Sequence, residues 1–163
     1  MTRGLSPEAA GMVFRRCRSL SEERAVGRLL AERGITLAEH GVAGPDLFGL
    51  WDLTAPAGEC LVGGAATGPL GDGGEVQLRG IAVAVTEEAH GLHRRLVCGV
   101  ADSLRARGAA RLIARPAGGA GPPRVLLRSA GFAPAGASRA SRESAPGAGA
   151  PADDEGGWWE LEL

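Results

Sequence analysis

Residues 76–104 constrain the fold most, because their hydrophobic pattern changes from that of a strand to that of a helix within one stretch. In the second half of the stretch the apolar residues recur at steps of three and four, which predicts an amphipathic helix. These residues are Leu92, Leu96, Val97, Val100, Ala101 and Leu104. Gly108 stands where a glycine is expected just past a helix end. The unpaired N–H groups of the first turn, with Arg94 and Arg95 close by, predict an anion site where this helix begins.

In the strand that precedes this helix, the alternation of apolar residues changes phase. The alternating residues are Val76 and Leu78 and then, one position out of step, Ile81, Val83 and Val85. One extra residue near positions 79–80 accounts for the change, and this predicts a β-bulge. The alternative is a strand buried on both faces, in which the glycine at position 80 has no special role.

Capping and turn signals place the other elements. Ser19 and Glu22 form a capping box, in which both side chains satisfy backbone N–H groups at a helix start. Pro56 and Gly58 mark the turn of a hairpin. In chain order we expect a strand at 12–18, a helix after Ser19, hairpin strands at 47–53 and 60–67, the bulged strand, the long helix and a strand at 110–115.

The segment from the bulged strand into the long helix resembles motif A of the GCN5-related N-acetyltransferases (GNATs), which reads roughly apolar-x-V-x-P-x-x-[QR]-x-x-G-x-[GA]. Val83, Gly91 and the run 94–96 fall in register with this motif. Residues 124–132, RVLLRSAGF, resemble the family's terminal segment, and the order of elements is also similar. The resemblance implies a single domain over residues 1–163 with an α/β fold of the GNAT type, in which helices flank a mixed, mostly antiparallel central sheet.

The same resemblance implies acetyl-CoA as the co-substrate. Its pantetheine arm would lie along the bulged strand and its pyrophosphate at the helix start. The residues implied are Ile81, Ala82 and Val83 for the arm, and Gly91, His93 and Arg94 for the pyrophosphate. Glu88 and His90, in the loop before the helix, are also implied in binding the cofactor.

Three positions differ from the family motif. Val85 replaces the proline, Glu88 replaces the Gln or Arg that opens the loop, and His93 replaces a small final residue. A missing side chain at that last position lets backbone N–H groups approach a pyrophosphate, and an imidazole narrows the space. Because a phosphate beside the imidazole would favour its protonated form, we expect His93 to act as a cationic phosphate ligand.

Two groups that handle protons in many family members are replaced. Leu127 stands at the position of the terminal tyrosine, and Ile113 stands at that of a glutamate on the strand after the long helix. Among the remaining acids, we expect Glu75, at the start of the bulged strand, to act as the catalytic base through water. The alternative for Glu75 is a solvated acid at a strand edge.

The expected activity is therefore that of an N-acyltransferase, which moves an acetyl group from acetyl-CoA to the amine of a small molecule or peptide. Two alternatives stay open. The chain could keep the fold as a non-catalytic binding or interaction module, because the tyrosine, the strand glutamate and the small loop residue are all replaced. It could also be a GNAT-like enzyme with an altered thioester or another ligand, in which His90 or His93 acts directly.

Composition bears on the remaining classes of partner. The net charge of −1 gives no reason to expect nucleic acid, and no apolar run reaches the roughly 18 residues of a membrane span. Glu87, Glu88, His90 and His93 have the look of a metal site, but no further His or Cys stands nearby in sequence, so no metal is expected. Three cysteines without C-x-x-C spacing suggest reduced thiols in a cytoplasmic protein, and Cys98 is expected in the core.

The C-terminal part of the chain combines a low-complexity stretch with a strand pattern. Residues 134–157 have no apolar period and are expected to form a loop. Residues 158–163 then alternate, with Trp159, Leu161 and Leu163 on one side. We expect this last strand to pair back into the sheet; the alternative is that it docks on a second subunit of a homodimer.

Overall fold

The computed structural model describes residues 11–37, 45–56, 58–84, 89–116, 122, 124–135 and 157–163, and of Ala89 and His90 it describes the backbone alone. In this part of the chain, seven strands form one sheet in the order β1-β2-β3-β4-β5-β7-β6. The elements are β1 (Met12–Arg16), α1 (Leu20–Glu32), β2 (Asp46–Asp52), β3 (Cys60–Thr67), β4 (Glu75–Val83), α2 (Ala89–Arg105), β5 (Arg111–Ala114), α3 (Arg124–Ser129), β6 (Ala133–Pro134) and β7 (Trp159–Glu162).

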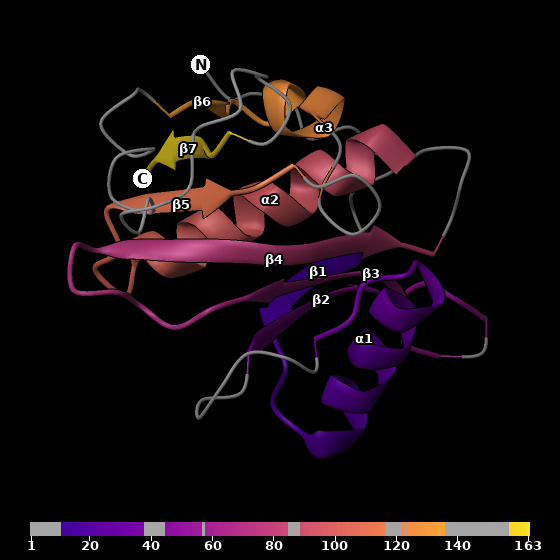
Figure 1. Ribbon diagram of the computed structural model, residues 1–163. Helices are drawn as coiled ribbons and strands as arrows, with labels where there is room; N and C mark the ends of the chain where they lie inside the picture. The colour runs from indigo at the N-terminus through magenta and orange to yellow at the C-terminus, as the bar shows by residue number, and fades with distance from the viewer. Residues whose placement is uncertain are drawn as a thin grey trace, which may run out of the picture.

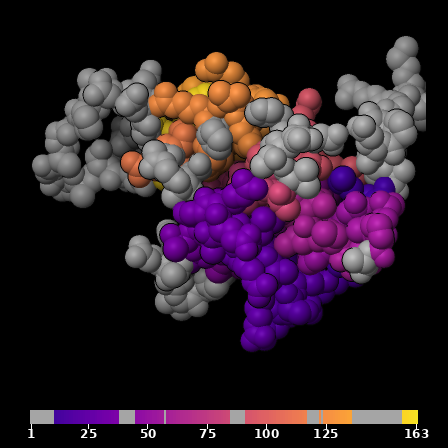
Figure 2. Space-filling view, turned by 90° about the vertical axis from the view of Figure 1, so that its right-hand side faces the viewer, coloured from indigo at the N-terminus to yellow at the C-terminus, as the bar shows by residue number. Residues whose placement is uncertain are grey.

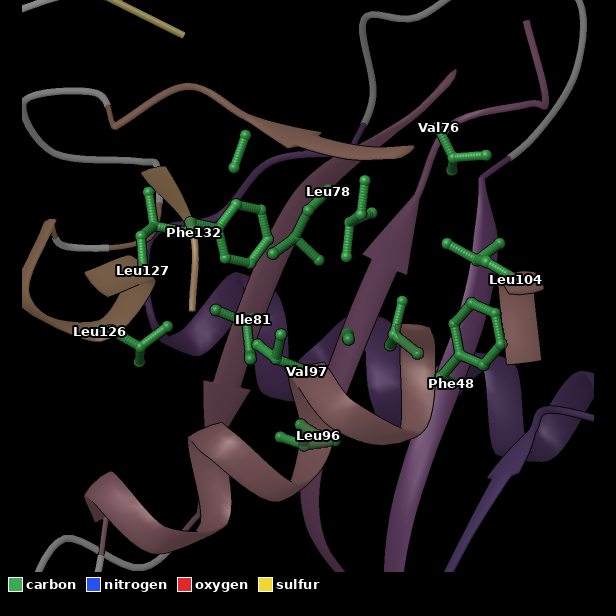
Figure 3. Close-up of a cluster of buried hydrophobic side chains, with 14 of the residues drawn as sticks. Phe48, Val76, Leu78, Ile81, Leu96, Val97, Leu104, Leu126, Leu127 and Phe132 are labelled. Atoms are coloured by element: carbon green, nitrogen blue, oxygen red, sulfur yellow. The ribbon is translucent and has the colours of Figure 1, made fainter. Parts of the chain in front are cut away.

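The sheet is mixed and mostly antiparallel, as expected, because β4–β5 is the one parallel pair among the described strands. The long helix α2 covers one face of the sheet and α1 covers part of the other face (Figure 1). The larger hydrophobic cluster lies between the sheet and the helices α2 and α3, and it includes Leu78, Val97 and Leu127 (Figure 3). A smaller cluster joins α1 to β3 and β4 through Leu30, Ala66 and Ala82, so both faces of β4 are buried near its end.

The predicted bulge is present in β4. Its pairing with β3 steps from Ala66↔Gly80 to Thr67↔Leu78, which leaves Arg79 as the extra residue. On the other side, β4 pairs with β5 from Glu75↔Arg111 to Leu78↔Ala114, and the pairing goes no further. The parallel pairing thus stops at the residue before the bulge, and β4 runs on past the end of β5 (Figure 1).

The capping box at the start of α1 is confirmed. The Glu22 N–H donates to Ser19 Oγ at 3.3 Å, and Glu22 Oε2 accepts from the Arg18 N–H at 2.7 Å. The end of α2 is also as predicted, because Gly108 has a φ of +84° and its N–H donates to the Arg105 carbonyl at 3.0 Å. Local side-chain chemistry therefore fixes both of these helix ends.

The start of α2 differs from the prediction. The helix begins at Ala89, three residues before the apolar stripe that starts at Leu92. The resemblance to motif A places a loop at residues 88–93, and this is wrong from Ala89 onward, where the chain is helical. The apolar stripe marks only the part of a helix that faces the core, so a helix can begin before its stripe does.

The C-terminal strand pairs back into the sheet of its own chain, as expected. β7 lies between β5 and β6, with Leu112↔Leu161 and Ala133↔Glu160 in register. Trp159 is buried, and Leu161 and Leu163 pack against the larger cluster. The two-residue strand β6 escaped prediction, because Ala133–Pro134 is too short to show an alternation.

The position of Cys98 is a correction. This residue was expected in the core, but its side chain is exposed. On the helix α2 it points away from the buried stripe that contains Val97 and Val100. Cys60 is also exposed. Cys17 is half-buried, and burial raises the pKa of its thiol to about 11.

Replacing Trp159 with Ala should lower the free energy of unfolding by about 3–5 kcal/mol, because the indole fills the core and the surrounding side chains cannot close the space. The adjacent Trp158 is the matched control. It is half-buried on the opposite face, where Cζ of Arg115 lies 5.9 Å from the centroid of its ring. Replacing Trp158 with Ala should lower the free energy of unfolding by about 1 kcal/mol. Urea denaturation of both variants measures the difference, and equal losses would contradict the placement of β7.

Candidate active site

The sheet has an opening beside the second half of β4. The Ala84 N–H donates to the Val62 carbonyl of β3 at 2.8 Å. In an antiparallel ladder successive residues face opposite sides, so Ile81 and Val83 direct their backbone N–H and C=O groups away from β3. On that side β5 stops pairing at Leu78, and no described strand takes its place. The opening can therefore accept an extended group that forms hydrogen bonds with the strand.

The first turn of α2 lies at the same end of the molecule as the opening. β4 ends at Val83 and α2 begins at Ala89, on the side from which Figure 2 views the molecule. The N–H groups of this turn have no partners within the helix. Gly91 is exposed, and a Cβ built on it would meet nothing within 4 Å, so a ligand can approach the backbone there. Backbone amides, the helix dipole and open space give this helix start the properties that suit an anion.

The basic side chains of this helix have different roles. Arg94 is exposed beside the first turn, where it can reach a bound anion. Arg95 instead donates to the Met12 carbonyl at 3.0 Å and so ties α2 to β1. His93 is half-buried and interacts with the protein. Glu88 lies outside the described residues, and His90 is the second residue of α2.

Of the three strand residues predicted to bind the pantetheine arm, two face the opening with their backbone. Ile81 and Val83 offer N–H and C=O groups to it, and their side chains anchor β4 in the larger cluster. Ala82 directs its backbone toward β3 and packs its methyl group against α1. Its contribution is thus to hold the strand in place.

The two positions from which proton-handling groups are missing have different surroundings. Leu127 is fully buried beside Phe132 in the larger cluster (Figure 3). Ile113 is half-buried, in register with Gln77 of β4 and Glu160 of β7, on the sheet face opposite α2. The side chain at position 127 is therefore part of the core rather than of the opening.

Glu75 begins β4, at the end of the strand that is paired on both sides. Its carboxylate forms a salt bridge with Arg111 at 3.2 Å, and its side chain is 27% exposed. At about 3.3 Å per residue, its Cα lies about 13 Å from that of Arg79, so it could act at the opening only through water. The assignment of Glu75 as the catalytic base stays a prediction.

Arg79, the bulge residue, is a feature that sequence reasoning missed. Its Nε and Nη1 atoms are buried, and neither has a hydrogen-bond partner in the described part of the chain. The guanidinium lies over Gly68, whose added Cβ would come within 3.2 Å of Nε and Nη2. A buried N–H without a partner costs about 1–3 kcal/mol, and more when the group is charged. The change of phase marked the bulge, but nothing local predicts that this guanidinium is shielded from water.

Among the side chains of the described residues, no three His, Cys, Asp or Glu residues lie close enough together to hold a metal ion. None of the described helices is both long enough and apolar enough to cross a membrane.

Several solved acetyltransferases have similar structures. N-acetylglutamate synthase from Neisseria gonorrhoeae, solved with coenzyme A and N-acetylglutamate, is 20% identical over 94% of this chain, with a TM-score of 0.57. The chain spans 35% of the length of that synthase. An acetyltransferase of the GNAT family from Desulfovibrio desulfuricans is 20% identical, with 93% of this chain and 99% of that one covered and a TM-score of 0.60. An aminoglycoside 6'-acetyltransferase of type Ii is 12% identical, with 92% of this chain and 96% of that one covered and a TM-score of 0.60.

Comparisons of sequence alone give a different result, because no family model and no curated protein sequence matches the chain. At 12–20% identity, the structural likeness is a likeness of fold. The chain has the GNAT fold, as the resemblance of residues 81–96 and 124–132 implied.

Replacing Leu127 with Tyr tests whether this position belongs to the core. The larger side chain and its hydroxyl should lower the free energy of unfolding by about 1–3 kcal/mol, because the site is fully buried. Val125, which is 72% exposed on the same helix, provides the control, and Val125→Tyr should be neutral. Chemical denaturation measures the free energy of unfolding of both variants. A Leu127→Tyr protein that is as stable as the parent and transfers acyl groups faster would place position 127 at the opening.

Proposed function

We propose that this protein is an N-acyltransferase that moves an acetyl group from acetyl-CoA to the amine of a small molecule or peptide. The observation that carries the proposal is the coincidence of two sites at one end of the molecule. The opening beside Ile81 and Val83 suits an extended amide-bearing arm, and the first turn of α2 suits a pyrophosphate. The acetyltransferases with similar folds support it.

The two sites would bind the donor in a fixed direction. The pyrophosphate would accept hydrogen bonds from the first N–H groups of α2, next to Gly91, and Arg94 would add charge. From there the pantetheine arm would follow β4 backward from Val83 to Ile81 and hydrogen-bond their backbone groups. The thioester end would then lie beside the bulge at Arg79.

The donor supplies an activated carbonyl group, and the chain supplies the surroundings for its transfer. The amine nitrogen forms a bond to the carbonyl carbon, the C–S bond breaks, and the proton lost by the amine balances the one that the thiolate gains. Backbone N–H groups at the opening can polarise the carbonyl. Glu75 is our candidate for accepting the amine proton, through water.

A second candidate function is that of a non-catalytic binding module. The observation that favours it is the burial of Leu127 in the core, together with the absence of any tyrosine from the chain. Binding of acetyl-CoA without transfer to any amine in a broad panel would support this second function over the first.

Gly91→Ala gives the sharpest test of the donor site. Alanine should stabilise α2 by up to about 1 kcal/mol, since its Cβ meets no protein atom. The same methyl group would obstruct a pyrophosphate at the helix start, so acetyl-CoA binding, measured by calorimetry, should weaken by at least about tenfold.

Gly27→Ala is the matched control for this test. Gly27 lies inside α1, and its added Cβ also meets nothing within 4 Å. The variant should gain similar stability and bind acetyl-CoA as the parent does. Unchanged binding by Gly91→Ala would count against a pyrophosphate at this turn.

His93→Gly tests whether the histidine supports or obstructs the donor. If His93 donates to a phosphate, the variant should bind acetyl-CoA about threefold to tenfold more weakly, as expected for the loss of one hydrogen bond. Calorimetry beside the parent protein measures this. A parent that does not bind and a variant that does would instead show that the imidazole closes the site, and would favour an altered ligand.

A further inference from the structure

We propose that the acceptor amine also carries a carboxylate, and that Arg79 binds this carboxylate. The inference rests on the proposed function, because it places the acceptor next to the thioester end of the donor. It adds what that function leaves open, namely the chemical class of the acceptor and the residue that selects it.

Arg79 stands at the junction between the two parts of β4. Before it, residues 75–78 pair with β5; after it, Ile81 and Val83 face the opening. A pantetheine arm that runs from Val83 toward Ile81 leads its thioester to this junction. The guanidinium is therefore attached to the part of the strand where the acyl group would be transferred.

The side chain of Arg79 projects from the sheet face opposite α2. Val76 and Leu78 point into the larger cluster, so the alternating residues before the bulge, Glu75, Gln77 and Arg79, point to the other face. On that face the guanidinium lies over Gly68, where no Cβ occupies the space. The donor arm and the acceptor would thus meet at the bulge, with Arg79 on the acceptor's side.

Two nitrogens of this guanidinium, Nε and Nη1, are buried without a hydrogen-bond partner among the described residues. The residue as a whole is partly exposed. A carboxylate can accept two parallel hydrogen bonds along one edge of a guanidinium, from Nη2 and either Nε or Nη1, and neutralise its charge. Such a ligand would satisfy one of the two N–H groups that the described chain leaves unpaired.

Two other arginines on this face, Arg111 and Arg115, have partners among the described residues. Arg111 forms ion pairs with Glu75 and Glu160, and Arg115 lies over the ring of Trp158. Arg79 differs from both because its buried N–H groups lack a partner among the described residues.

The charge of Arg79 also bears on the amine. A nearby cation disfavours the protonated form of an amine and so favours the neutral form that attacks a thioester. The same charge repels acceptors that carry several amino groups. An acceptor with a carboxylate reduces this repulsion and gains a charged hydrogen bond.

The test compares acids with their uncharged amides as acceptors. The parent protein, saturated with acetyl-CoA, is given glycine and glycinamide, 3-aminopropanoate and its amide, and 4-aminobutanoate and its amide. Thiol release gives kcat/KM, and mass spectrometry identifies each product. For at least one pair, the acid-to-amide ratio in the parent should exceed that in Arg79→Gln by about 10- to 100-fold, as expected for a charged hydrogen bond.

Two further variants separate recognition from general charge and from folding. Arg115→Gln removes the same charge from the same face and should leave the ratio unchanged. Arg79→Met, measured by thermal unfolding without ligand, should be as stable as the parent or more stable, because it removes buried unpaired N–H groups. A marked loss of stability would show that Arg79 serves the fold and would overturn the inference.

The outcomes distinguish this inference from the proposed function. Transfer to amines with the same acid-to-amide ratio in the parent and Arg79→Gln would overturn the role of Arg79 and leave the acyltransferase in place. No binding of acetyl-CoA and no transfer to any amine would overturn the proposed function, and this inference with it. A ratio that falls in Arg79→Gln alone, while calorimetry shows unchanged acetyl-CoA binding, supports the inference.

Discussion

The parallel pairing of β4 with β5 ends after four residues, and the features of the candidate site depend on where it ends. Because β4 continues beyond this point, Ile81 and Val83 keep their hydrogen-bonding groups on one side without a strand to satisfy them. The bulge at Arg79 sets the limit, since an extra residue changes the twist and direction of the strand. Both faces of β4 are buried, one by the cluster that contains Leu30 and the other by the cluster that contains Val97. This packing holds the open half of the strand in place.

The sequence predicted those features that depend on local periodicity or local side chains. The change of phase between Leu78 and Ile81 locates the bulge, and Ser19 locates the start of α1, because each signal lies within a few residues of its effect. The alternation from Trp159 to Leu163 likewise predicted a strand that returns to the sheet.

What the sequence could not predict depends on packing between distant segments. The start of α2 escaped the hydrophobic period because a helix can begin before its apolar stripe does. Cys98 proved exposed because its side chain points away from the stripe that contains Val97 and Val100. The burial of the Arg79 nitrogens arises where β4 meets Gly68, and neither residue shows this alone. Glu75 could be placed on the strand from sequence, but its salt bridge with Arg111 required the parallel register.

The replacement of the tyrosine by Leu127 is compatible with acyl transfer on chemical grounds. A thiol has a reference pKa of about 8.5 and a tyrosine one of about 10, so a thiolate can leave near neutral pH and take its proton from water. The amine presents the larger difficulty, because near neutral pH most alkyl amines carry a proton and cannot attack. A guanidinium beside the amine shifts that balance toward the neutral form through its charge alone. In this chain Arg79 could therefore favour deprotonation of the amine and also select an acceptor whose carboxylate pairs with its guanidinium. The bulge would bring the Arg79 guanidinium to the end of the donor arm, where it would serve both the binding of the acceptor and the reactivity of its amine. The fully buried Leu127 would contribute to the core alone.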